Sequence, residues 1–241
     1  MNRTNKAVFL GILLFLFFAA LYAFPVSSTE LSQQSSTEST PAFKADEALK
    51  KLLDGNQRFA AGLPAQKDVG AARRTALLKG QSPSAVLLSC SDSRVPPELV
   101  LDQGLGDIFV VRVAGNVADP VTLGSIEYAA EHLNVPLIIV MGHDRCGAVA
   151  ATIQGGKPEG NIRSIVAKIA PAVRKARASG KKGDDLLEAA VIENVKNVIA
   201  SLTRESKIIK QLVKEKKVKI VAAKYSLSTG KVELLEQPKG R

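Results

Sequence analysis

The sequence predicts an α/β domain, in which a parallel β-sheet forms the core and helices flank it. Short apolar runs alternate along the chain with longer segments of helical apolar spacing, which is the order of a βαβ sheet. The composition agrees, because 46% of the 241 residues are hydrophobic while only 5% are aromatic. Such a core has to be packed with Val, Ile, Leu and Ala, as buried parallel strands are.

The individual elements follow from local patterns. Ala48, Leu49, Leu52 and Leu53 have helical spacing, so a helix is predicted before the sheet. The predicted strands are the apolar runs at residues 85–89, 108–113 and 137–141. The predicted helices cover residues 43–59, 122–133, 162–178 and 186–206, the last with Asp184 and Asp185 as N-cap residues. Residues 218–225 and 231–235 are predicted to close the domain as a hairpin.

The first 28 residues are expected to be a targeting segment. Arg3 and Lys6 precede an unbroken apolar run from Ala7 to Phe24, a length that fits a secretory signal and also approaches a membrane span. We favour export to the periplasm or outside the cell, with cleavage before Thr29, and keep a retained membrane anchor as the alternative. Residues 29–42 are rich in Ser, Thr and Gln and are predicted to be a flexible tether. Residues 43–241 are expected to form one domain.

The formal net charge of +10 does not by itself assign a partner. The C-terminal third is basic, but its cations stand among helical apolar repeats without interleaved aromatic residues or a nucleic-acid motif. We therefore expect a solvated basic surface and no nucleic-acid partner. Membrane contact is expected only through the N-terminal segment, if that segment is not cleaved.

Both cysteines of the chain stand at the C-terminal ends of predicted parallel strands, where open α/β sheets place their sites. Cys90 follows the first strand and Cys146 follows the third, with His143 three residues before it. Two thiolates and an imidazole suit Zn²⁺ with a fourth position left open. The alternative is a Cys90–Cys146 disulfide, which an exported protein could form. Zinc is favoured because a disulfide needs neither His143 nor the Asp92 and Arg94 that follow Cys90.

At these residues the chain resembles the β-class carbonic anhydrases. That family carries Cys-x-Asp-x-Arg after one strand and His-x-x-Cys after another, which are Cys90–Arg94 and His143–Cys146 here. Further segments fall in family order, among them residues 55–59, 81–83, 107–112, 114–116 and 125–128. The resemblance covers roughly residues 43–236. It implies a zinc enzyme with one Zn²⁺ per chain, which interconverts CO₂ and bicarbonate by attack of zinc-bound hydroxide on CO₂.

The resemblance also implies roles for particular residues. Asp92 would orient the attacking hydroxide, and Arg94 would keep Asp92 ionised and off the metal by a bidentate pair. The substrate site would consist of Gln81, Phe109, Tyr128 and Gly115, the first three matching the plant-like branch whose zinc is open at neutral pH. In the family this pocket is completed across a dimer interface, on which N-terminal helices pack. A homodimer or higher homo-oligomer is therefore expected.

Two places depart from the commonest family pattern: Val113, and the pair Asp144–Arg145 between His143 and Cys146. Both leave the ligands intact but put local hydrogen bonds and a proton exit route in doubt. His132 is expected to be a surface residue rather than a proton relay. Two other functions stay open, namely hydrolysis of carbonyl sulfide or carbon disulfide on the same zinc site, and a disulfide-linked surface protein that binds anions.

Overall fold

The computed structural model of the protein describes residues 41–236. The predicted targeting segment, residues 1–28, and the tether up to residue 40 lie outside the described residues. Helix α1 spans Pro41–Ala60, so the helix begins two residues before the predicted domain boundary at residue 43. Within the described residues, no helix is both long and apolar enough to cross a membrane.

Within residues 41–236, five strands form one sheet in the order β2-β1-β3-β4-β5. They are β1 (Ala85–Ser89), β2 (Ile108–Arg112), β3 (Leu137–His143), β4 (Lys219–Tyr225) and β5 (Val232–Leu234). The first four are parallel and β5 runs antiparallel to β4, which confirms both the parallel sheet and the closing hairpin. Alternate residues enter opposite cores, with Leu88 and Val140 on one face and Leu87 and Ile139 on the other. Because both faces of β1 and β3 are buried, these strands are continuously apolar.

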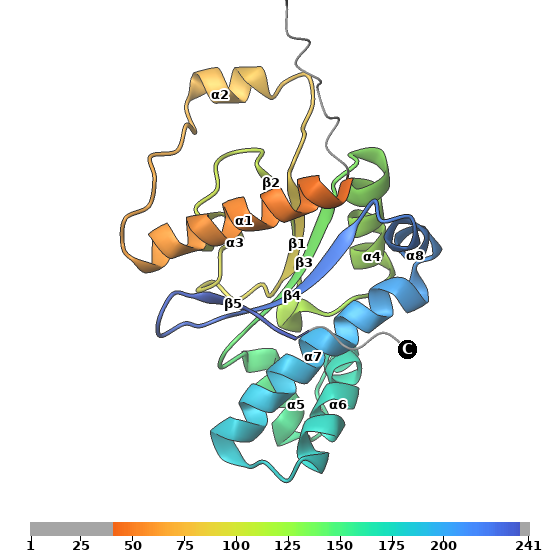
Figure 1. Ribbon diagram of the computed structural model, residues 1–241. Coiled ribbons are helices and arrows are strands. Elements are labelled where there is room, and N and C mark those ends of the chain that lie inside the picture. The colour runs from red at the N-terminus through yellow and green to blue at the C-terminus, as the bar shows by residue number, and fades with distance from the viewer. Residues whose placement is uncertain (1–40, 237–241) are drawn as a thin grey trace, which may run out of the picture. The chain divides into compact units, whose positions relative to one another are not determined.

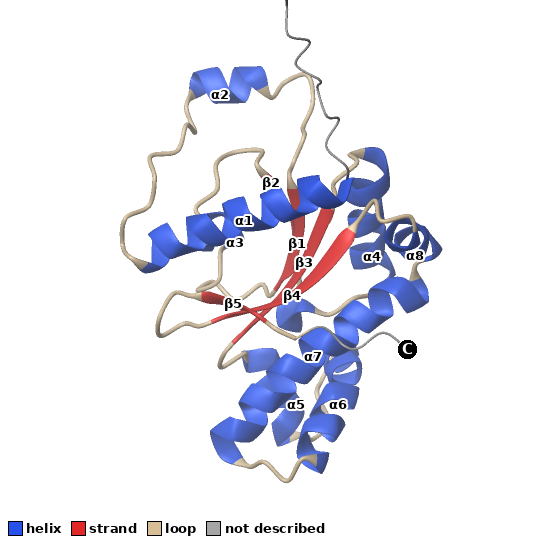
Figure 2. Cartoon of the chain, viewed as in Figure 1, coloured by secondary structure: helices blue, strands red, loops and turns tan. Residues whose placement is uncertain are grey.

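Helices cover both faces of this sheet, as Figure 2 shows. Residues of α1 and of the short helix α3 (Pro97–Val100) pack on one face. The other face is covered by α4 (Pro120–Glu127), the π-helical turn η2 (Tyr128–His132), α7 (Gly183–Glu205) and α8 (Lys207–Lys214). Helices α5 (Gly147–Gln154) and α6 (Ile162–Ala178) share a third apolar cluster with α7 and gather at one end of the molecule in Figure 1. The predicted class of a parallel sheet flanked by helices is confirmed.

Two predictions about helix ends need correction. Asp184 and Asp185 do not cap α7, because the helix begins at Gly183 after Lys182 and both carboxylates lie in its first turn. There they still stabilise the helix, since negative charge near an N-terminus interacts favourably with the helix dipole. The helix predicted at 122–133 consists of α4 and then η2. Its N-cap is Asp119, whose side chain accepts a hydrogen bond from Thr122 N over 2.8 Å.

Residues 62–84, here called the arm, leave the body between α1 and β1 and carry helix α2 (Ala71–Ala76). No residue of α2 is buried, and Figure 1 shows α2 standing apart from the sheet. Three large apolar side chains of the arm are exposed: Leu63 by 72%, Val69 by 60% and Leu78 by 81%. By contrast, α1 buries Ala45, Ala48 and Leu52 against the sheet of its own chain. Of these two helices, α1 therefore has one face buried in its own chain and α2 has none; the packing of N-terminal helices on a partner stays a prediction.

Candidate metal centre

The sheet order places the predicted site at a point where the connections reverse direction. From β1 the chain moves to β2 at the edge, then crosses back to place β3 on the other side of β1. The crevice outside the carboxyl ends of β1 and β3 is therefore the topological switch point, where open α/β sheets bind their ligands. Cys90 follows β1 directly, His143 is the last residue of β3, and Cys146 immediately precedes α5.

The structure brings the three predicted ligands together. One ligand atom from each of Cys90, His143 and Cys146 lies within 4.8 Å of the others, and all three residues are buried. Both cysteines are free thiols. His143 Nδ1 lies 2.9 Å from the carbonyl oxygen of Asp144, which can only accept, so Nδ1 carries the proton and Nε2 has a free lone pair. Nε2 is buried and has no hydrogen-bond partner among the described residues, as expected of an atom that ligates a metal.

The two thiols are electrostatically coupled. The pKa of the Cys90 thiol is lowered, chiefly because the Cys146 thiol donates a hydrogen bond to its sulfur, and this outweighs the opposing effect of burial. The pKa of Cys146 is raised because its proton is held in that bond and because the thiol is buried. The N–H groups of Ala148 and Val149, in the first turn of α5, act in the opposite direction and favour a thiolate at Cys146. A dication bound by both sulfurs would displace the shared proton.

Cys90 is fixed by its neighbours in the sheet and beside it. The guanidinium of Arg112, at the end of β2, donates from Nε to the carbonyl oxygen of Cys90 (3.0 Å) and from Nη2 to that of Asp92 (2.6 Å). The N–H of Gly115 points at the Cys90 sulfur, with 3.3 Å between nitrogen and Sγ. The turn after β1 is thus held at its backbone and at its ligand atom.

Asp92 and Arg94 form the predicted bidentate pair. Arg94 donates from Nε to Oδ1 of Asp92 over 2.9 Å and from Nη2 to Oδ2 over 2.7 Å, and its backbone N–H reaches Oδ1 over 3.0 Å. These bonds from the Arg94 side chain and backbone hold the pKa of the Asp92 carboxyl far below its usual range, against a smaller effect of burial. Asp92 Oδ2 also lies 3.8 Å from His143 Nε2, so an ionised carboxylate stands beside one of the three predicted ligands.

The predicted substrate residues lie on different elements of the chain. Phe109 lies on the edge strand β2 and Tyr128 on η2, with their ring centroids 6.3 Å apart, and Tyr128 is 48% exposed. Gln81 is exposed at the end of the arm, where it lines a surface hollow with Arg74, Leu78 and Gly106. Gly115 does lie at the site, but its N–H serves the Cys90 sulfur.

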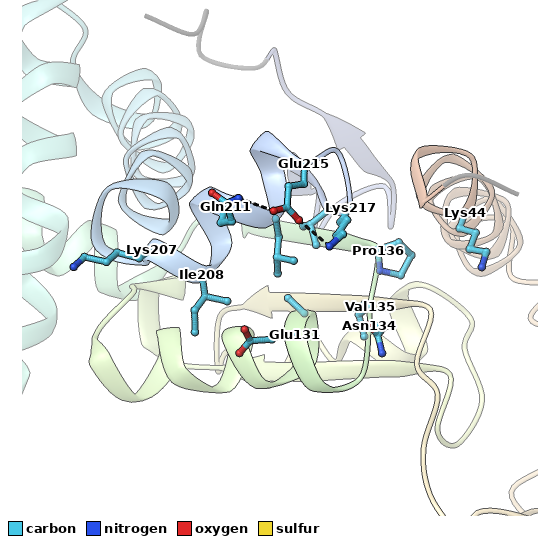
Figure 3. Close-up of a pocket in the computed structure, with 13 residues that line it drawn as sticks. Lys44, Glu131, Asn134, Val135, Pro136, Lys207, Ile208, Gln211, Glu215 and Lys217 are labelled. Carbon is cyan, nitrogen blue, oxygen red and sulfur yellow. Dashed lines mark hydrogen bonds and ion pairs between the residues drawn. The ribbon is translucent and has the colours of Figure 1, made fainter.

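A cavity of about 680 Å³ lies elsewhere, between α8, η2 and the first turn of α1 (Figure 3). Val135, Pro136 and Leu212 line it, together with polar side chains such as Lys44 and Lys207. Glu215 at its edge accepts hydrogen bonds from Gln211 and Lys217, as the dashed lines show. None of the predicted site residues contributes to this cavity.

The departures from the family pattern have visible structural roles. The carboxylate of Asp144 accepts from Leu227 N (2.9 Å) and Ser226 Oγ (3.3 Å), which ties the end of β3 to the β4–β5 turn. Val113 continues the ladder between β1 and β2 through its backbone N–H and carbonyl. His132, predicted to be a surface residue, has a side chain that is mostly exposed.

Two residues that support the site were not predicted from the sequence. Arg112 falls in a segment that resembles the family but carries no predicted role, and no prediction concerns Asn194 of α7. Asn194 is buried and donates to the carbonyl oxygen of Gly115 over 2.8 Å. A signal for Asn194 was available in the sequence, because it is a polar residue on the apolar stripe that α7 otherwise forms with Val191, Val195 and Val198.

Comparison with known proteins agrees with this geometry. A family model described as carbonic anhydrase matches residues 85–232, more than half of the chain. The carbonic anhydrase of Mycolicibacterium smegmatis is 46% identical over 191 residues, which cover 78% of this chain and 91% of that protein. Carbonic anhydrase 2 of Mycobacterium tuberculosis is 43% identical over the same shares.

Solved structures identify the class. The β-carbonic anhydrase CcaA has a TM-score of 0.64 at 27% identity, over 78% of this chain and 95% of that one. The Coccomyxa β-carbonic anhydrase, solved in complex with acetazolamide, also reaches 0.64 at 26% identity, over 78% and 86% of the two chains. The chain belongs to the β-class carbonic anhydrases. It is an enzyme of the lyase class, and the reaction of its family is the reversible hydration of CO₂ to bicarbonate and a proton.

Proposed function

We propose that this carbonic anhydrase binds one Zn²⁺ per chain through Cys90, His143 and Cys146. The observation that carries the proposal is the buried Nε2 of His143, which lies beside two thiol sulfurs and has no hydrogen-bond partner in the part of the chain that the structure describes. Three protein ligands of this kind leave a fourth tetrahedral position for water or substrate. A Cys90–Cys146 disulfide would account for the sulfurs but would leave Nε2 of His143 buried without a partner, so zinc fits the donor set better.

The chain's own residues then orient the reaction. When bound, zinc supplies a nucleophile near neutral pH by lowering the pKa of a water molecule from 15.7 to about 7. Asp92 is the catalytic carboxylate that accepts a hydrogen bond from the attacking water and aims its lone pair at CO₂. Arg94 keeps Asp92 ionised and directed, because its two side-chain hydrogen bonds match the two carboxylate oxygens.

The Asp92–Arg94 pair supports a site in which the fourth position on zinc is free of protein ligands at neutral pH. A zinc ion with two thiolate ligands has its charge neutralised, so it attracts a third anion weakly, whereas Arg94 already gives Asp92 a bidentate cationic partner. We therefore assign this protein to the open branch, with Asp92 paired to Arg94 rather than to the metal.

We further propose that a second copy of the chain completes the substrate pocket. Gln81 at the end of the arm and Tyr128 on η2 are exposed in one chain, Phe109 is half-buried on the edge strand β2, and Gly115 lies beside the ligands. The exposed arm has apolar side chains that a partner would cover. Two β-carbonic anhydrases of Sordaria macrospora, similar to this chain at a TM-score of 0.62 and 25% identity over 78% of this chain and 97% of the other, are tetrameric.

Export of the protein is proposed on its sequence alone. The apolar run from Ala7 to Phe24 behind Arg3 and Lys6 supports a targeting segment, with the mature chain starting near Thr29. N-terminal sequencing of protein from separated periplasmic and membrane fractions tests this, because a retained anchor would leave Met1 in the membrane fraction.

The metal proposal is tested on the wild-type protein purified under reducing conditions. We expect one zinc per chain by elemental analysis, no reaction of Cys90 or Cys146 with a thiol reagent until the metal is removed, and CO₂ hydration in a stopped-flow assay. Active protein that contains a Cys90–Cys146 disulfide, or that hydrates CO₂ at full rate after its zinc has been removed, would overturn the proposal.

A further inference from the structure

Asn194 is a polar side chain placed where α7 is otherwise apolar. It is 1% exposed and lies between Val191, Val195 and Val198, which pack into the cores beside the sheet. Burying an amide costs free energy unless its donors and acceptors are paired. Its Nδ2 is paired with the carbonyl oxygen of Gly115, but its Oδ1 has no partner among the described residues. The incomplete pairing means that packing alone does not explain an amide at this position.

The partner of Asn194 is the residue that contacts a metal ligand. The N–H of Gly115 donates to the sulfur of Cys90 over 3.3 Å, while its carbonyl accepts from Asn194 over 2.8 Å. The two hydrogen bonds therefore flank the same α-carbon. Holding the carbonyl restricts how far the residue can rotate, and so restricts the direction in which its N–H points.

The backbone at Gly115 needs such a restraint. Its φ of +69° is in the left-handed region, and glycine adopts this region about as readily as the right-handed one, so the conformation is not fixed by the residue itself. A β-carbon at this position would lie 2.6 Å from Cδ1 of the buried Ile169, and the positive φ strains any residue with a side chain, so a stiffer residue would be strained here. Asn194 thus provides from a helix 79 residues away the restraint that a side chain at position 115 cannot supply.

We propose that Asn194 is a positioning residue for the metal centre, holding Gly115 so that its N–H bonds to the Cys90 sulfur. The inference rests on the proposed zinc site. A hydrogen bond to a thiolate withdraws charge from the sulfur and fixes its orientation, and such outer-shell partners typically change metal affinity by about 10–100-fold. Asn194 acts only through Gly115 and touches neither the ligands nor the substrate.

The test compares Asn194→Leu, which has nearly the same shape but no donor, with Ser201→Ala. Ser201 is a suitable control because it is also buried on α7, but its hydroxyl bonds only to the carbonyl of Val198 in its own helix. The readouts are the affinity for Zn²⁺ in competition with a chromophoric chelator and the sulfur-to-metal charge-transfer band after loading with Co²⁺. Asn194→Ala, checked by circular dichroism, is measured in the same way in case the leucine variant does not fold.

We expect the Asn194 variants to bind Zn²⁺ about 10–100-fold more weakly and to shift the Co²⁺ charge-transfer band to longer wavelength, since the sulfur retains more charge. Ser201→Ala should change neither readout. Asn194 variants that fold with wild-type metal affinity and an unshifted band would overturn the proposal and leave Asn194 a structural residue. Failure of the zinc site itself would show differently, as a wild-type protein without metal.

Discussion

The metal corner, formed by residues 90–94 and 143–146, is dense with internal contacts, whereas the surface that carries Gln81, Phe109 and Tyr128, here called the open surface, is exposed at Gln81 and Tyr128 and half-buried at Phe109. At the corner the Cys90 sulfur accepts from Gly115 N–H, and three hydrogen bonds from Arg94 hold the Asp92 carboxylate. On the open surface, α2 buries no residue and β2 has neighbours on one side only. The difference is the basis of our two proposals, that one chain holds the metal by itself and that a second chain completes the substrate pocket.

The largest expected effect is at the corner. Cys146→Ser removes one of three ligands, so zinc should be lost and CO₂ hydration should fall by about a thousandfold or more. The proposed oligomer should persist, because Cys146 is buried in an apolar cluster of its own chain that contains no residue of the arm. Elemental analysis and ultracentrifugation measure the two properties separately. Asp92→Asn is the matched control, which should lose activity but keep its zinc; a Cys146→Ser protein with full zinc would contradict the ligand assignment.

The second-largest expected effect comes from a substitution that disrupts the proposed interface and leaves the metal ligands intact. Leu78 is exposed on the arm, so Leu78→Asp costs little in a lone chain but places a charge in the proposed interface. We expect the variant to be monomeric at micromolar concentration and about a hundredfold less active, with one zinc per chain. Ile162→Asp is the control, because Ile162 is similarly exposed but begins α6. A monomeric Leu78→Asp protein with wild-type activity would show that one chain contains a complete pocket.

A smaller effect tests how Asp92 is held. Arg94→Ala removes both side-chain hydrogen bonds to the Asp92 carboxylate, which should then move onto the zinc and lower activity by about 10–100-fold with zinc retained. Arg94→Lys should recover only part of this, because an ammonium cannot bond both oxygens in the guanidinium's fork geometry. X-ray absorption at the zinc edge would report the added oxygen ligand. A wild-type crystal structure near pH 7.5 with Asp92 at about 2.0 Å from zinc would contradict the open-site assignment.

The sequence predicted the central elements of the fold because their signals are strong. β1 and β3 are buried on both faces, and continuous apolar runs follow directly from that. Helices α2, α3, α5 and α8 were missed, since segments of four to eight residues are too short to show a helical period. β2 was predicted as a strand, but its residues are only half-buried because it lies at the edge of the sheet. This could not be predicted, since an apolar run shows that a strand forms but not its place in the sheet.

The ligands were predictable for a different reason. Cys90, His143 and Cys146 are residue types that bind metals, and they stand at the C-terminal ends of predicted parallel strands. Their positions in the sequence therefore predicted that they meet at one edge of the sheet. Residues that act through the backbone left no such signal. Gly115 was assigned to substrate by resemblance, yet its N–H bonds to the Cys90 sulfur, and Arg112 bonds to backbone carbonyls of the same turn. Tertiary contacts of this kind depend on the completed sheet and helices.

The smallest effect concerns Asp102, which joins the arm to the body. Its buried carboxylate accepts from Arg58 Nε (2.6 Å), from the N–H of Ala65 (3.1 Å) and from Lys67. Burial alone would raise the pKa of Asp102, but the hydrogen bonds from Lys67, Ala65 and Arg58 outweigh it and the pKa is lowered. A lowered pKa stabilises the folded state above the unfolded value of about 3.9, and that stability is lost as the pH falls through the folded value.

Asp102→Asn should therefore lower the free energy of unfolding at pH 7 by about 1–3 kcal/mol, because Arg58 and Lys67 lose their counter-ion but keep some contact with solvent. The difference from wild type should shrink as the pH falls below about 3.9, because the unfolded chain then binds a proton at Asp102 more readily than the folded chain, whose Asp102 pKa is lowered. Urea unfolding at pH 7 and pH 3, at one protein concentration, measures it. Asp54→Asn is the control, since its pair with Lys50 is exposed and contributes about 0–0.5 kcal/mol. Zinc content should stay unchanged, because the metal corner contains none of the residues that bond to Asp102. A difference in unfolding free energy that does not depend on pH would show that the charge of Asp102 does not anchor the arm.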